Sequence, residues 1–116
     1  MSNDRLNQIF EMQAKLQKLH NHNFNDMSLK DKEQYSKDMI LYLLDEVHEL
    51  LREINFKSYK KVKKDINIDN IHEELADIGA FFNNLCLCWG VSPDSYFKAY
   101  KNKNQKNIAR VSDKNY

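Results

Sequence analysis

Two stretches, LLDEVHELL at residues 43–51 and HEELADIGAF at residues 72–81, decide the fold. Each contains two acidic residues three positions apart: Glu46 and Glu49 in the first stretch, and Glu74 and Asp77 in the second. Because residues three apart share one face of an α-helix, each pair projects two carboxylates in the same direction from a helix whose other face is apolar. Two such helices packed together predict a site for a hard divalent cation inside a helical bundle.

The composition around these stretches favours an all-α fold. The 116 residues include two Gly and one Pro, which leaves few residues suited to hairpin turns. At this length, residues 1–116 are expected to form a single domain with a small hydrophobic core that would gain from oligomerisation. We therefore predict a compact all-α bundle of four to five helices that works as an oligomer.

Charge and hydropathy exclude several classes of protein. A net charge of +1 argues against a strongly basic nucleic-acid binder, and the chain has no apolar run of the roughly 18 residues that a membrane span needs. The first ten residues, MSNDRLNQIF, lack the pattern of a signal peptide, which predicts a cytoplasmic protein. Cys86 and Cys88 have no second Cys pair to complete a zinc site, so we expect buried free thiols.

Apolar periodicity and capping residues predict the helices. Four are expected, over residues 4–20, 29–54, 70–89 and 93–111, with loops at 21–27 and 55–67. The third helix is expected to be capped by Asp69 or Asn70 and to end at Gly90, while Ser92 and Pro93 form a strong start for the fourth. The 55–67 loop is basic, with five Lys between positions 57 and 64, and has room for one helical turn.

The acidic pairs admit two interpretations. Either pair alone is typical of a solvated helix face, but two pairs beside apolar positions such as Ala76, Ala80 and Phe81 predict that Glu74 and Asp77 are partly buried. Buried carboxylates need compensation, by a cation or by Lys side chains from the basic loop. An all-carboxylate site favours Mg²⁺, with Mn²⁺ as a substitute. A di-iron site of the ferritin type is excluded because neither helix carries Glu-x-x-His.

A second polar group lies near the C-terminus. Lys103, Asn107 and Arg110 are spaced i, i+4, i+7, which places them on one helix face. They combine a point charge, an amide and a bidentate guanidinium, a set suited to binding a polyphosphate, although an exposed basic helix would have the same pattern.

These motifs together resemble a known family. The E-x-x-E and E-x-x-D pairs, with 24 residues between them, resemble the signature of the all-α NTP pyrophosphatases, which include MazG-like enzymes, phosphoribosyl-ATP pyrophosphohydrolase and the dimeric dUTPases. Three further stretches resemble the dimeric dUTPases in particular. They are IFEMQAKLQ around Gln13, FKSYKK at residues 56–61, and the K-x-x-x-N-x-x-R pattern of Lys103, Asn107 and Arg110.

The resemblance implies an enzyme that hydrolyses dUTP to dUMP and pyrophosphate with Mg²⁺, as a homodimer or a tetramer, and it leaves open whether dUDP is also cleaved. It implies that Glu46, Glu49, Glu74 and Asp77 hold the metal and that Glu46 also positions or deprotonates the attacking water. It further implies that Gln13 reads the uracil and Phe81 packs on the deoxyribose, while the phosphates contact Lys57, Lys103, Asn107 and Arg110.

Departures from the family pattern fall near the base and the sugar. Phe56 and Tyr59 stand where the family commonly has Trp, Gln17 where it has Asn, and Ala80 where it typically has His. Because a Gln amide can satisfy either uracil or cytosine, a MazG-like or dCTP-type pyrophosphatase is the first alternative. The second is a helical binding module without enzymatic activity, which would bind nucleic acid or a protein partner through the basic segments.

Overall fold

The chain folds into four α-helices and one short 3-10 helix in a computed structural model that describes residues 4–113. In order these are α1 (Arg5–Leu19), η1 (Phe24–Asp26), α2 (Leu29–Arg52), α3 (Ile68–Cys88) and α4 (Pro93–Ser112). The described residues contain no β-strand, so the predicted all-α class is confirmed. No helix among them is long and apolar enough to cross a membrane.

Local sequence signals account for where the helices begin and end. Ser28 and Ser92 both form capping boxes, in which the Ser hydroxyl accepts from the backbone three residues on. Gly90 ends the α3 segment with a φ of 69°, a conformation that costs glycine little. The predicted cap of α3 was wrong: Asn67, two to three residues earlier, accepts from the backbone nitrogen of Asn70.

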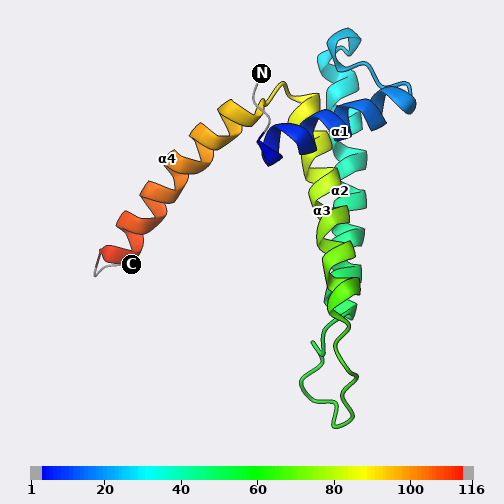
Figure 1. The fold of residues 1–116 in the computed structure, drawn as a ribbon, viewed down its shortest axis with the longest axis vertical. Coiled ribbons are helices and arrows are strands. Elements are labelled where there is room, and N and C mark those ends of the chain that lie inside the picture. Colours follow the sequence, from blue (N-terminus) through cyan, green and yellow to red (C-terminus); the bar gives the residue numbers. More distant parts are fainter. Residues whose placement is uncertain (1–3, 114–116) are drawn as a thin grey trace.

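The α2 and α3 helices lie side by side in opposite directions, and α1 crosses them near the end where α3 finishes (Figure 1). The opposite end carries the connection of residues 53–67, where the optional helical turn is absent. Two hydrogen bonds between Asn55 and Lys64 close this connection: the Asn55 side chain donates to the carbonyl of Lys64 and accepts from the backbone nitrogen of Lys64, each at 3.0 Å.

The packed core lies where α1, α2 and the end of α3 meet. Phe10, Tyr35, Cys86 and Cys88 are its buried hydrophobic side chains, and the two free thiols are buried as predicted. Polar bonds inside the core fix its geometry. The Tyr35 hydroxyl donates to Gln17 Oε1 at 2.8 Å, and Trp89 Nε1 donates to Ser36 Oγ at 2.6 Å.

The α4 helix projects away from the α2 and α3 pair (Figure 1). Its first turns contact the rest of the chain, where the rings of Tyr96 and Phe82 lie 5.4 Å apart, but residues 97–113 are all exposed. The radius of gyration is 17.8 Å, against about 13 Å for a compact domain of this length. The helices therefore form an open bundle whose fourth member lacks a packing partner within the described chain.

The Tyr35–Gln17 bond generates a stability prediction. Burial raises the pKa of Tyr35, so its hydroxyl remains a protonated donor to Gln17, which is also buried. Replacing Tyr35 with Phe leaves the Gln17 oxygen without its donor, and we expect a loss of about 1–3 kcal/mol in the free energy of unfolding, measured by urea denaturation. Tyr59→Phe, in the exposed 53–67 connection, is the matched control and should have little effect; equal losses in both variants would contradict the prediction.

Candidate metal centre

The acidic residues are positioned by the register of α2 against α3. Residues 39, 42, 46 and 49 follow one face of α2 at helical spacing, and residues 84, 81, 77 and 74 follow one face of α3 in the opposite direction. Two contacts fix this register above the acidic residues. Asn84 Nδ2 lies 3.6 Å from Met39 Sδ, and the rings of Tyr42 and Phe81 lie 5.9 Å apart.

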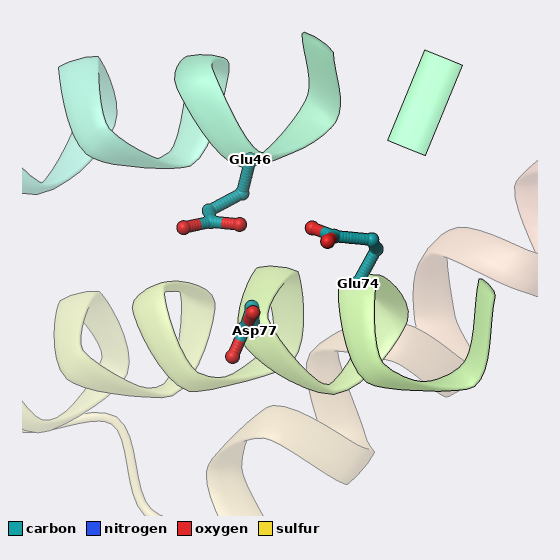
Figure 2. A group of neighbouring side chains, drawn as sticks. All are labelled: Glu46, Glu74 and Asp77. Carbon is teal, nitrogen blue, oxygen red and sulfur yellow. The ribbon is translucent and has the colours of Figure 1, made fainter. Parts of the chain in front are cut away.

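Three carboxylates meet directly below these contacts. One oxygen from each of Glu46, Glu74 and Asp77 lies within 4.8 Å of the other two, a spacing that would allow all three to bind one metal ion. Glu46 projects from α2 toward α3, and the Glu74 and Asp77 side chains project from successive turns of α3 (Figure 2). Glu49 is exposed and lies outside this group of three, although its charge contributes to raising the pKa of Glu46.

Burial differs among the four acidic residues. Glu46 and Glu74 are half-buried, whereas Asp77 and Glu49 are exposed. The prediction of partial burial was therefore right for Glu74 and wrong for Asp77. Asp77 is exposed because α1 crosses only the far part of α3 and α4 turns away, so no described element covers this end of the helix pair.

Two carboxylate oxygens at the centre lack partners. Glu46 Oε2 and Glu74 Oε2 are buried, and no described residue donates a hydrogen bond to either. Lysines of the 53–67 connection do not compensate them as the alternative interpretation required. Lys63 Nζ donates to the carbonyls of Lys57 and Ser58, and Lys64 Nζ donates to the carbonyl of Arg52. An unpartnered buried carboxylate is costly, so this arrangement fits a bound cation.

Crowding shifts the protonation of these groups. Loss of hydration, followed by the charge of Glu49, the close approach of the Glu74 carboxyl group and the charge of Asp77, raises the pKa of Glu46 from 4.5 to about 7. The pKa of Glu74 is also raised, with loss of hydration again the largest cause. Without a cation, the centre therefore tends to keep a proton near neutral pH. A divalent cation would remove that tendency and bind with release of the proton.

Two of the predicted nucleotide contacts lie along the same helix faces. Phe81 is half-buried one turn from Asp77, and Gln13 of α1 donates from Nε2 to Asn84 Oδ1 at 2.7 Å. Asn84 was missed by the sequence analysis. Its position seven residues after Asp77, on the same face of α3, was the signal that could have identified it.

The remaining predicted contacts lie elsewhere. Lys57 is in the 53–67 connection, with Nζ 5.7 Å from the centre of the Phe56 ring. Lys103, Asn107 and Arg110 lie on the exposed part of α4, which extends away from the helices that carry the carboxylates (Figure 1). A single chain in this conformation does not bring these three side chains to the acidic centre.

Comparison with known proteins gives one result. A family model described as dUTPase matches residues 5–95, a range that includes all four acidic residues, Gln13, Lys57 and Phe81 but ends before Lys103. No curated protein and no solved structure gives a significant match.

The raised pKa of Glu46 predicts a pH-dependent stability in the metal-free protein. Because folding raises this pKa from 4.5 to about 7, the folded state binds the proton more tightly than the unfolded chain does. Stability is therefore lost as the pH rises through this interval. In EDTA we expect Glu46→Gln to melt at a higher temperature than the wild type at about pH 7.5, and the difference to shrink at about pH 5.

The control is Glu73→Gln, which removes the same charge from an exposed position next to Glu74. It should follow the wild-type pH profile. If Glu46→Gln lowered the melting temperature by the same amount at both pH values, the carboxylate would not be the destabilising group.

Proposed function

The chain belongs to the dUTPase family, and from this premise we propose that it hydrolyses dUTP to dUMP and pyrophosphate in a reaction that requires Mg²⁺. Membership makes it an enzyme of the dUTP diphosphatase type. The observation that carries the metal requirement is the pair of buried carboxylate oxygens, on Glu46 and Glu74, to which no described residue donates. Such a reaction would keep uracil out of DNA and supply dUMP.

Four carboxylates would hold the metal. Glu46, Glu74 and Asp77 offer oxygens close enough to share an ion, and Glu49 lies one turn from Glu46 at the edge of the group. Oxygen ligands without Cys or His favour Mg²⁺, with Mn²⁺ as a substitute. Bound Mg²⁺ supplies neutralisation of phosphate charge and activation of water for attack.

The protein's own residues would orient the substrate and the water. Glu46, whose pKa is raised to about 7 by burial and by the neighbouring carboxylates, is proposed to position or deprotonate the attacking water. Phe81 offers a ring next to the acidic centre for the deoxyribose, where a 2′-hydroxyl would be crowded. Gln13 of α1 contacts Asn84, which lies about one turn of α3 beyond Phe81, and Gln13 is proposed to contact the base.

The phosphate contacts require a second copy of the chain. Lys103, Asn107 and Arg110 lie on a part of α4 that projects into solvent, so we propose that α4 packs against a partner and that the enzyme works as a homodimer or tetramer. Exposed apolar side chains on α2 support this proposal. Ile40, Leu44, Val47 and Leu51 form one helical stripe facing away from α3, and Leu44 is 58% exposed.

Glu49→Gln tests the assignment of the centre. The substitution removes one ligand charge while preserving the size of the side chain. We expect pyrophosphate release from dUTP to fall at least about a hundredfold, because the metal that this ligand helps to hold neutralises the phosphate charge and supplies most of the catalysis. The assay measures pyrophosphate release from dUTP and the other deoxynucleoside triphosphates, and phosphate release from dUDP, with Mg²⁺, with Mn²⁺ and with EDTA. Glu73→Gln is the control and should retain activity. A near wild-type rate in Glu49→Gln would contradict the assignment.

Leu44→Asp tests the assembly. A charge in the middle of the exposed stripe of α2 should shift the molecular mass measured by light scattering from that of an oligomer to that of one 13.9 kDa chain, and activity should fall with it. Val62→Asp introduces the same charge at an apolar side chain that is 89% exposed in the 53–67 connection, and it should leave the mass unchanged. A monomeric wild-type enzyme with full activity would show that α4 needs no partner.

A further inference from the structure

The Gln13 side chain is held by a chain of three residues. Gln13 Nε2 donates to Asn84 Oδ1 at 2.7 Å, and Asn84 Nδ2 lies 3.6 Å from Met39 Sδ. Asn84 is only 4% exposed, so water cannot easily replace either contact. The three residues come from α1, α3 and α2 respectively, which makes this one of the points where all three helices meet.

Met39 determines which way the two amides face. A thioether sulfur accepts hydrogen bonds weakly and cannot donate, so it favours the orientation in which the NH₂ group of Asn84 faces Met39 and the Asn84 oxygen faces Gln13. That oxygen accepts only from the NH₂ group of Gln13. Flipping either amide would set two acceptors or two donors against each other in a buried site, at a cost comparable to a lost hydrogen bond.

The Gln13 oxygen is left available to a ligand. No described residue donates to it, and the Gln13 side chain is only partly buried. Asp77, Phe81 and Asn84 follow one face of α3, so the acidic centre and the Asn84 contact are about 10 Å apart along the helix axis. This is comparable with the distance from the phosphate to the far edge of the base in a pyrimidine nucleotide.

Uracil and cytosine need opposite orientations of such an amide. Uracil presents a donor at N3 and an acceptor at C4, whereas cytosine presents an acceptor at N3 and a donor at C4. A freely rotating Gln could satisfy either base in the same pose, because it carries both an acceptor and donors. A Gln whose amide cannot flip satisfies one base and opposes the other, which is the situation that gives strong discrimination.

We propose that Asn84, itself oriented by Met39, is a positioning residue that fixes the orientation of the Gln13 amide. Through Gln13 it makes the site select a pyrimidine with hydrogen on N3 and oxygen at C4 over one with an amino group at C4. This inference rests on the proposed function, because it assumes that Gln13 contacts the base of a nucleotide substrate. It assigns specificity to two residues that do not themselves touch the substrate.

Asn84→Ser and Asn84→Asp test the inference. A Ser hydroxyl donates or accepts equally well and no longer fixes Gln13, so the ratio of kcat/KM for dUTP to that for dCTP should fall about tenfold. Asp has the same shape as Asn and its oxygens accept, so it should keep the ratio near the wild-type value. Thymine shares the hydrogen-bonding edge of uracil, so the ratio of dUTP to dTTP should stay constant in both variants.

The outcomes separate the inference from the proposed function. A purely structural role for Asn84 would lower all three activities together and leave every ratio unchanged, which would overturn the inference. Should Asn84→Ser fail to fold, Met39→Leu preserves volume while removing the sulfur, and it should lower the dUTP to dCTP ratio in the same direction. An unchanged ratio in Met39→Leu would also count against the inference. A wild-type enzyme that hydrolyses no deoxynucleotide would overturn the proposed function itself.

Discussion

The antiparallel register between α2 and α3 is the constraint on which the rest of the structure depends. Met39 faces Asn84, Tyr42 faces Phe81, and Glu46 faces the Glu74 and Asp77 pair, so three kinds of contact share one alignment. Since both helices repeat every 3.6 residues, a shift of the register by one residue would rotate all of these side chains out of the α2–α3 interface together. The three pairs therefore specify one another, and the distance from the acidic centre to the Asn84 contact is fixed by the helix rise.

The crowded carboxylates between α2 and α3 oppose folding, and contacts at both ends of the helix pair hold the two helices together. At one end, Trp89 donates to Ser36 and the buried Cys88 thiol lies 4.0 Å from the Ser36 hydroxyl, which ties the end of α3 to the beginning of α2. At the other end, Asn55 clasps Lys64 and closes the connection. Between them Glu46 Oε2 and Glu74 Oε2 are buried without a described partner, an arrangement that a bound cation would stabilise.

Much of this arrangement could be predicted from the sequence because it depends on local signals. Apolar periodicity located the helices, and Ser92, Pro93 and Gly90 marked their ends. The three-residue spacing identified Glu46, Glu74 and Asp77, whose carboxylates meet between α2 and α3, and also Glu49, which lies outside that group. The sequence could not give the exposure of Asp77, because that depends on how far α1 and α4 extend over α3. Asn84 was missed for a related reason: its spacing from Asp77 places it on the same face of α3, but its partners Gln13 and Met39 come from two other helices.

The α4 helix projects away from the other helices because it has no packing partner within the described chain. Its exposed part carries Lys98, Lys101, Lys103, Lys106 and Arg110, opposite in sign to the carboxylates of the seam, yet it projects away from them. Its apolar side chains Phe97, Tyr100, Ile108 and Val111 are also exposed, because no described element lies beside this part of α4 to bury them. Packing against a second copy would cover the apolar stripe of α2 and could bring cations to a neighbouring acidic centre. The apolar stripe of α2 and the basic part of α4 thus both favour packing against a second copy of the chain. Because an acidic centre without nearby cations would repel a triphosphate, catalysis itself would then depend on assembly.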